Sequence, residues 1–311
     1  METIELKDFI ELPYGENITQ SASISPIDNG LDYEVLSDNS ALEYLDYLNM
    51  TKTVEVLSEF FDVNAVAVAK EGILCMASLG ASAENAFEKT IEADPLCIVN
   101  STIGFSKKVT LEIAKQVNVM SFRNIVATEF EDSAVDYLVN DSNLNVIRIK
   151  SPLQEILGFN ACDIKVTPFG YLVQSQNLSK LTKDSFKVIS KTKPTQQQAE
   201  DAIFAWKVAK YAKSKSAVIA KDLSVKAIVQ AGHNGIEVTE RAMDLACENS
   251  KDAVLAIDGV VENEEIINAA IQGRIGLIIE SGDLPVSSKF SKLADKYEIA
   301  YIVTGIRNNK Y

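Results

Sequence analysis

Two lysine-containing stretches and a single histidine are where side chains of this sequence are best placed to do chemistry. Lys70 ends the apolar run NAVAVAK at 64–70, and functional residues collect where buried strands end. Partial burial would lower the pKa of its amine, as a catalytic or ligand-binding lysine requires; the alternative is an edge lysine that reaches solvent. Glu71 follows directly and can act as a general base only where its surroundings raise its pKa toward neutrality. The pair is a candidate catalytic site.

The histidine and the second lysine lie in the other half of the chain. His233 is the one histidine, and its place in the glycine-rich turn AGHNG favours a hydrogen-bonded structural role over catalysis. Lys215 lies at a predicted helix-to-strand junction, where side chains can meet a ligand. Four cysteines are widely spaced without a CxxC pair, so neither a zinc site nor a disulfide framework is expected. With one histidine, no transition-metal site is expected either.

The stretch KPTQQQAEDAIFAWKVAKYAKSKSAVIAKD at 193–222 predicts the elements around Lys215. Pro194 suits a first helical turn, and Thr195 followed by acidic residues fits the positive end of a helix dipole. Apolar residues recur at spacings of three and four: Ala202, Ala205, Trp206, Ala209 and Ala212. AVIA at 217–220 is then typical of a strand covered on both faces.

Similar patterns alternate along the whole chain, and its second half repeats the first in outline. We predict helices at 40–61, 81–95, 109–117, 132–139, 237–247, 262–271 and 287–296, and strands at 64–70, 96–105, 124–127, 145–149, 216–220, 225–230, 253–257, 275–280 and 299–304. This alternation predicts an α/β layer structure with mainly parallel strand pairing. We expect two units, residues 1–160 and 161–311.

Length, charge and hydropathy restrict the class of protein. With 311 residues, of which 47% are hydrophobic, the chain can form two core-bearing units. No apolar run is long enough to span a bilayer, and the start, METIELKDFIEL, carries charge where a signal peptide would be apolar. We expect a cytoplasmic protein without a membrane partner. The net charge of −14 argues against nucleic acid as a partner, but a small anion needs only a few local cations.

Several segments follow one another in the order of a known family. They are LPYGENITQ at 12–20, AKEGILCMA at 69–77, EADPLCIVNSTIGFSKKV at 92–109, DIKVTPFGYLVQ at 163–174, the stretch at 193–222, IVQAGHNG at 228–235, VLAID at 254–258 and TGIR at 304–307. Together they resemble the aminoimidazole carboxamide ribonucleotide (AICAR) formyltransferase domain of the bifunctional purine-biosynthesis protein. The cyclohydrolase domain that precedes it in that family has no counterpart here, so ring closure would need another protein.

The resemblance implies a fold, ligands and an assembly. The fold would be α/β, with two cytidine-deaminase-like three-layer α/β/α units packed together. Formyl-tetrahydrofolate would be the co-substrate, a purine nucleotide intermediate the acceptor, and no metal would take part. The active site would lie between the units and across a homodimer interface.

The resemblance also implies site residues. Lys70 matches the lysine of the family's KHxNPCG loop, and Glu71 stands where the family has the histidine that handles the proton of the substrate amine. The substrate-binding positions would be Tyr14, Gly15, Asn17, Asp94, Lys215, Gly232, His233, Asp258 and Arg307. Pro13 replaces an arginine that holds the nucleotide phosphate, and proline offers no donor. The segment YGEN is equally consistent with a simple turn.

Two interpretations of function follow. In the first, the protein transfers the formyl group of formyl-tetrahydrofolate to the AICAR amine, with Lys70 orienting the reactants and Glu71 replacing histidine. In the second, the fold is kept while the chemistry is lost, leaving a nucleotide- or folate-binding protein or a structural partner. The loops that supply reacting groups depart from the family at nearly every position, which favours the second.

Overall fold

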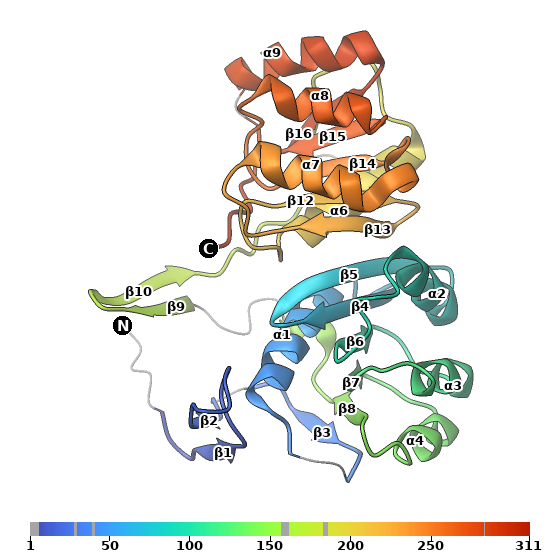
Figure 1. Cartoon of the computed structure of the whole chain (residues 1–311), viewed down its shortest axis with the longest axis vertical. Helices are drawn as coiled ribbons and strands as arrows, with labels where there is room; N and C mark the ends of the chain where they lie inside the picture. The colour runs from blue at the N-terminus through green and yellow to red at the C-terminus, as the bar shows by residue number, and fades with distance from the viewer. Residues whose placement is uncertain (1–5, 28–29, 39–40, 157–161, 183–185, 283) are drawn as a thin grey trace. The chain divides into compact units, whose positions relative to one another are not determined.

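The computed structural model is a mixed α/β protein in which helices alternate with strands of both directions (Figure 1). It describes every residue except 1–5, 28–29, 39–40, 157–161, 183–185 and 283. The chain forms two compact units. Unit 1 comprises residues 1–74, 82–84 and 96–178, and unit 2 comprises residues 75–81, 85–95 and 179–311. The boundary expected at 160/161 falls outside the described residues.

Unit 1 carries five strands in the order β4-β6-β7-β8-β3, of which β6, β7 and β8 are parallel. Two further pairs, β1–β2 and β9–β10, are separate antiparallel sheets of two strands. The elements are β1 (Ile10–Leu12), β2 (Ala22–Ile24), β3 (Tyr33–Val35), α1 (Tyr44–Ser58), β4 (Asn64–Lys70), β6 (Thr102–Phe105), α3 (Leu111–Asn118), β7 (Asn124–Ala127), α4 (Asp132–Leu138), β8 (Asn145–Ile149), α5 (Leu153–Ile156), β9 (Cys162–Thr167) and β10 (Gly170–Ser175).

Helix α1 packs directly on β4 and β6 in unit 1. Its approach to β6 is close enough to require glycine at one position. A Cβ added to Gly104 would lie 2.2 Å from Cγ2 of Thr53 and 2.8 Å from Cδ1 of Leu57, both on α1. The helix begins with a capping box in which Glu43 and Asp46 satisfy each other's backbone N–H groups. Thus α1 is fixed at both its start and its sheet contact.

Unit 2 carries its strands in the order β11-β16-β15-β14-β12-β13-β5, of which β14, β15 and β16 are parallel. Strand β5 and helix α2 lie mostly in this unit. The elements are β5 (Ile73–Gly80), α2 (Ala83–Ala93), β11 (Lys187–Val188), α6 (Gln196–Ala209), β12 (Ala217–Lys221), β13 (Ser224–Val229), α7 (Gly235–Ala246), the 3-10 turn Cys247–Ser250, β14 (Val254–Ile257), α8 (Glu264–Gln272), β15 (Leu277–Glu280), α9 (Leu284–Ala294), the 3-10 turn Asp295–Tyr297 and β16 (Ala300–Val303).

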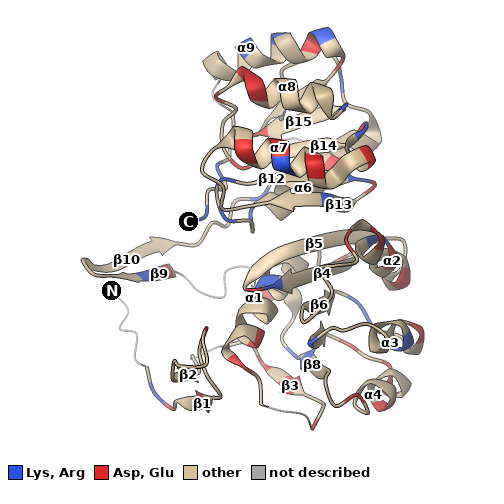
Figure 2. Ribbon diagram, viewed as in Figure 1, with Lys and Arg blue, Asp and Glu red and all other residues tan. Residues whose placement is uncertain are grey.

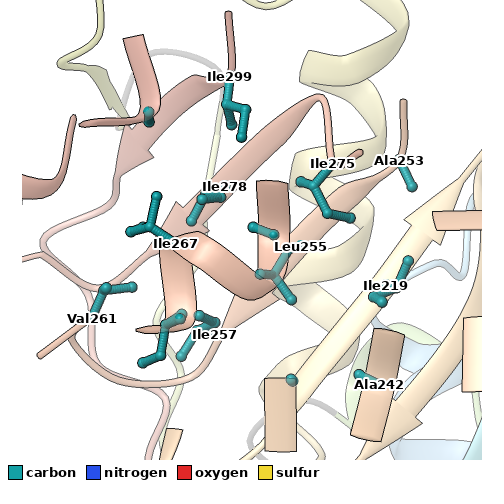
Figure 3. Packing of buried hydrophobic residues seen from close by; sticks show 14 of the residues in the cluster. Ile219, Ala242, Ala253, Leu255, Ile257, Val261, Ile267, Ile275, Ile278 and Ile299 are labelled. Carbon is teal, nitrogen blue, oxygen red and sulfur yellow. The ribbon is translucent and has the colours of Figure 1, made fainter. Parts of the chain in front are cut away.

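The core of unit 2 joins helices α7, α8 and α9 to one face of this sheet (Figure 3). Inward-facing residues alternate along each strand, so Leu255, Ile257 and Ile278 belong to this cluster while their neighbours point to the opposite face. Helix α6 packs against β12, β14 and β15 without contributing to the cluster, and it therefore covers that opposite face. Thr195 begins α6 with a capping box, in which its Oγ1 accepts from the N–H of Gln198 at 3.1 Å.

Most predicted elements are confirmed, including α6, β12 and the strand that ends at Lys70. The prediction of mainly parallel pairing is wrong, because parallel pairs are confined to β6–β7–β8 and β14–β15–β16. Strands β12 and β13, for example, are joined by two residues at positive φ, Asp222 and Leu223, and such a short connection makes an antiparallel hairpin. The strand expected at 96–105 begins only at Thr102, because turns precede it.

Candidate functional site

Lys70 and Glu71 lie at a tight turn in unit 1. Lys70 is the half-buried last residue of β4, and exposed Glu71 forms with Gly72 the two-residue connection to β5. Both connecting residues have positive φ, 53° and 70°. The N–H of Gly72 donates to Oδ1 of Asn49 on α1 at 2.8 Å, which fixes the turn. Glu71 therefore stands at the exposed tip of a short connection between two strands.

The segment containing Tyr14, Gly15 and Asn17 is a self-contained turn. The N–H of Gly15 donates to the carbonyl of Gln20 at 2.9 Å. The backbone N–H and the side-chain amide of Asn17 both donate to Oε1 of Gln20, at 2.9 and 2.8 Å. The Tyr14 hydroxyl donates to Oε2 of Glu43 at 2.7 Å, and this bond is the main reason that the pKa of Tyr14 is raised. These polar groups are thus occupied by contacts within the fold.

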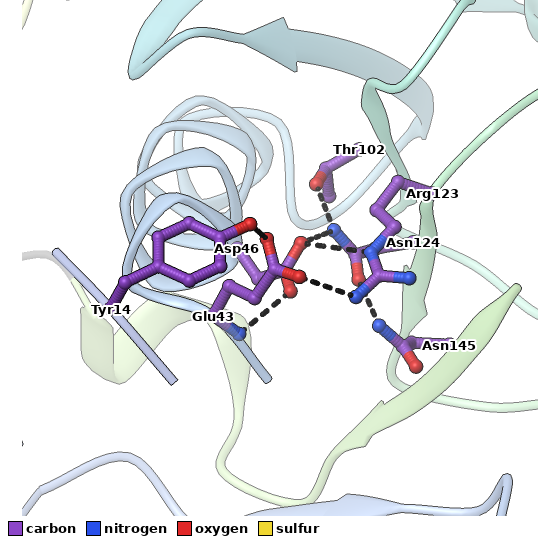
Figure 4. A network of polar contacts seen from close by, with 7 residues as sticks. All are labelled: Tyr14, Glu43, Asp46, Thr102, Arg123, Asn124 and Asn145. Carbon is purple, nitrogen blue, oxygen red and sulfur yellow. Dashed lines mark hydrogen bonds and ion pairs between the residues drawn. The ribbon is translucent and has the colours of Figure 1, made fainter. Parts of the chain in front are cut away.

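A polar network continues inward from Glu43 (Figure 4). Arg123, which is about a quarter exposed, lies 3.4 Å from Oε1 of Glu43 and 3.7 Å from Oδ1 of Asp46. Oδ1 of Asp46 also accepts from the side-chain amide of Asn124 at 2.8 Å, and Asn124 accepts in turn from Asn145. Arg123, the cation of this network, is therefore neutralised by the carboxylates of Glu43 and Asp46. An incoming phosphate would meet negative charge beside it.

Unit 2 brings four polar residues into one row at an end of its sheet. Ser216 directly precedes β12, while the other three directly follow β14, β15 and β16: these are Asp258, Ser281 and Thr304. These four residues lie in a row because the strand residues directly beside them are paired with one another in the sheet, from β12 through β14 and β15 to β16. Ligands of α/β proteins bind where parallel strands present their carboxyl ends.

Three members of this row are buried without partners. Neither carboxylate oxygen of Asp258 has a hydrogen-bond partner among the described residues, and the same holds for the hydroxyls of Ser216 and Ser281. All three residues are at most 1% exposed. Buried polar groups are normally paired, and each one left unsatisfied costs about 1–3 kcal/mol, more when it is charged. Three such groups lie in adjacent register positions, which makes this row a candidate ligand site.

Glu280 at the end of β15 is the contrasting case. This carboxylate is also fully buried, but its Oε2 accepts from the N–H of Val261 and its Oε1 accepts from the Tyr301 hydroxyl at 2.9 Å. Burial, followed by the charge of Glu280, raises the pKa of Tyr301 well above its ordinary value. Glu280 is therefore a structural carboxylate. The cost of burying Asp258, in contrast, is not offset by any hydrogen bond among the described residues.

Lys215 places a cation beside this row. Its Nζ lies 2.9 Å from the position that a Cβ on Gly259 would occupy, which places the ammonium over the residue that follows Asp258. Lys215 is half-buried and makes no ion pair in the part of the chain that the structure describes. Its backbone exchanges hydrogen bonds with Gly232, at 3.3 and 3.1 Å. The row can accept N–H donors at Asp258 and an anionic group at Lys215.

Of the other predicted site residues, His233 is exposed and its N–H donates to Oε2 of Glu237 at 3.1 Å. Gly232 has a packing role, since a Cβ there would lie 2.2 Å from Cγ1 of Val238. Arg307 is exposed and follows Thr304 by three residues, at the end of β16. Half-buried Asp94 directly follows α2. Unit 2 thus brings together Lys215, Gly232 and Asp258.

Comparison with known proteins identifies the family. The family model described as the AICARFT/IMPCHase bienzyme matches residues 1–244. The chain belongs to the AICARFT/IMPCHase bienzyme family. Bifunctional purine biosynthesis protein PurH of Thermoanaerobacter sp. (strain X514) is 31% identical over 304 residues, which cover 97% of this chain and 59% of that protein. The proteins of the same name from Dictyostelium discoideum and Aquifex aeolicus are 30% and 28% identical, covering 96% and 100% of this chain and 56% and 61% of theirs.

The chain therefore spans about 60% of the length of the curated PurH relatives that it matches. The resemblance to this family inferred from colinear motifs is confirmed. No described helix is long and apolar enough to cross a membrane. Within the described residues, no three His, Cys, Asp or Glu side chains gather as metal ligands would.

Ser216 and Ser281 are functional candidates that the motifs did not identify. In the sequence, each is a small polar residue at one end of an apolar run, and so is Asp258. This signal was available, because polar residues directly beside buried strands are where sites gather. The register that aligns them could not be read from a single sequence.

Proposed function

We propose that this member of the AICARFT/IMPCHase bienzyme family binds a purine-biosynthesis nucleotide at the polar row of unit 2 and does not transfer a formyl group. The single observation that carries the proposal is the buried Asp258 carboxylate, which has no partner among the described residues. An AICAR-like ligand has an amine and a carboxamide, whose N–H groups suit a carboxylate flanked by hydroxyls, and a phosphate that suits the ammonium of Lys215.

Loss of formyl transfer is supported by the contacts in unit 1. Formyl transfer needs a group that accepts the proton of the substrate amine, and the family's histidine is replaced by Glu71 at an exposed turn. The phosphate-holding arginine is replaced by Pro13, and the nearby Arg123 is engaged by Glu43 and Asp46. The finer features of the family, namely two deaminase-like α/β/α units packed together, formyl-tetrahydrofolate as a ligand, a homodimer and a cytoplasmic location, are proposed on the resemblance.

A second candidate function is an active AICAR formyltransferase. It is favoured by Lys70, which is half-buried at the end of β4 and matches the lysine of the family's KHxNPCG loop. In that case Glu71 would take the proton. The two candidates differ in one measurable property, turnover with formyl-tetrahydrofolate.

Binding is tested by isothermal titration of the AICAR ribonucleotide into the full chain. We expect saturable binding that Asp258→Asn and Lys215→Met each weaken by at least about tenfold, since a charge-assisted contact is worth about 1.5–3 kcal/mol. Asp244→Asn and Lys213→Met are matched controls, because both residues are exposed and outside the row. Absence of binding to the wild-type protein, or equal affinity of the row variants and the controls, would overturn the proposal.

Turnover is measured separately by following tetrahydrofolate release. We expect none with the wild-type protein. Robust turnover that Lys70→Ala abolishes would establish the second candidate instead.

A further inference from the structure

Lys226 lies at an irregularity of the hairpin that β12 and β13 form in unit 2. Ile219 of β12 pairs with Ala227 of β13. The next residue of β12, Ala220, pairs with Val225. Lys226 is therefore an extra residue of β13 without a counterpart on β12. Such a β-bulge redirects a side chain, and bulges are common beside active sites.

The side-chain amine of Lys226 is half-buried and has no carboxylate partner. It makes no ion pair in the part of the chain that the structure describes. An ammonium group that leaves water without gaining a partner loses part of its hydration, so burial disfavours the charged form. Burial is the main reason that the pKa of Lys226 is lowered from its ordinary value.

Charged groups from three elements of unit 2 also act on Lys226. Asp222, at the tip of the same hairpin, raises its pKa, and Lys89 lowers it. Smaller contributions from Glu92 and from Asp201 on α6 raise it. Lys89 and Glu92 both come from α2, which carries charges of both signs (Figure 2). Because Asp222 and Glu92 are exposed, water and salt screen their charges.

Hydrogen bonds occupy the buried carboxylate of this cluster and hold its second cation on the hairpin. Asp201 accepts from two backbone N–H groups of the hairpin turn, at 3.0 and 2.6 Å. Nζ of Lys89 donates to the carbonyls of Leu79 and Asp222, at 3.1 and 2.9 Å. Carbonyl groups do not cancel the charge of an ammonium group. The amine of Lys226 is thus partly desolvated and near a second cation, the two conditions that make a lysine nucleophilic.

We infer that Lys226 is a nucleophilic amine that forms an imine with a small uncharged aldehyde, with Lys89 as the neighbouring cation. The lone pair of Nζ forms a bond to the carbonyl carbon, and the π electrons of the C=O bond move to oxygen. Both protons of the amine then leave with that oxygen as water, and a C=N bond remains. Neither partner is oxidised or reduced. An anionic aldehyde would meet the exposed carboxylates of Asp222 and Glu92, which repel it.

The test is reductive trapping of the imine in the full chain at neutral pH. Propanal and sodium cyanoborohydride are the probes, and mass spectrometry of peptides measures the rate at each lysine. Two lysines are matched controls. Lys221 is half-buried on the same hairpin, but its Nζ donates to the carbonyl of Lys251 at 2.7 Å, and Lys213 is exposed. We expect Lys226 to react at least about fivefold faster than either control, because only the neutral amine attacks the aldehyde.

The dependence on pH and on Lys89 distinguishes a nucleophilic lysine from one that is merely accessible. As pH rises, the rate at Lys226 should reach its plateau at a lower pH than the rate at Lys213. Lys89→Met removes the second cation and should slow Lys226 by at least about twofold at neutral pH. Lys89→Arg keeps the charge and should keep the rate. Glu92→Gln removes an exposed charge that favours the ammonium form, and it should raise the rate.

Each outcome bears on one part of the assignment. Equal rates at Lys226, Lys221 and Lys213 overturn it, and so does a pH dependence at Lys226 that matches the one at Lys213. An unchanged rate in Lys89→Met overturns Lys89 as the activating cation. Circular dichroism shows whether each variant is folded, and Lys89→Gln replaces Lys89→Met if the latter is not.

Discussion

Two buried carboxylates at the strand ends of unit 2 should respond in opposite directions when their charge is removed. Asp258→Asn deletes a charge that has no partner among the described residues. Glu280→Gln deletes a charge that accepts from the N–H of Val261 and the hydroxyl of Tyr301. Both substitutions keep the shape of the side chain. We expect Asp258→Asn to stabilise unit 2 in the absence of ligand and Glu280→Gln to destabilise it.

The magnitudes follow from the contacts. Asn at position 258 would still be a buried polar group without a partner, so only the additional cost of the charge is removed, and Asp258→Asn should raise the free energy of unfolding by about 1 kcal/mol. A hydrogen bond to a charged group contributes about 1.5–3 kcal/mol, and an amide at position 280 would turn its NH2 toward one of two donors. Glu280→Gln should therefore lower the free energy of unfolding by about 2–4 kcal/mol.

The assay is urea unfolding followed by tryptophan fluorescence. Trp206 is the one tryptophan of the chain and lies buried in α6, so its emission reports on unit 2. A ligand at 100 times its dissociation constant should stabilise the wild-type protein by about 2.7 kcal/mol and the Asp258→Asn variant far less. If Asp258→Asn destabilises unit 2 as much as Glu280→Gln does, the Asp258 carboxylate contributes to the fold, and the argument for a ligand site there is refuted.

Three other predictions test separate parts of the structure. Burial lowers the pKa of Lys226, so the unfolded chain binds more protons and stability should rise with pH toward the lysine range; Lys226→Met should flatten this rise in urea titrations at several pH values. Gly104→Ala should cost about 1–3 kcal/mol because of Thr53 and Leu57, and adding Thr53→Ser, which removes Cγ2, should restore part of the loss in thermal melts. Tyr14→Phe should leave nucleotide affinity within about twofold in calorimetry, because the hydroxyl is engaged by Glu43.

The sequence predicted those features that depend on local pattern. The α6 helix, the β12 strand and the strand ending at Lys70 were all predictable, because apolar spacing determines them within one segment. The bond from Tyr14 to Glu43 spans 29 residues, and a polar contact of that kind depends on how α1 and the preceding turn pack. The polar row depends on register between strands distant in the chain, which a single sequence does not specify.

The two units differ in how the polar groups at their candidate sites are hydrogen-bonded, and this difference bears on which unit binds a ligand. Around Tyr14 in unit 1, replacements relative to the family coincide with a network in which the tyrosine hydroxyl, the carboxylates and the arginine are paired with one another, although Oδ1 of Asn145 at its inner end has no partner among the described residues. At Asp258 in unit 2, the groups without partners lower stability. A protein retains groups that lower its stability where its function needs them, because catalytic and binding sites commonly trade stability for function. On this argument we propose that unit 2 holds the ligand of the chain.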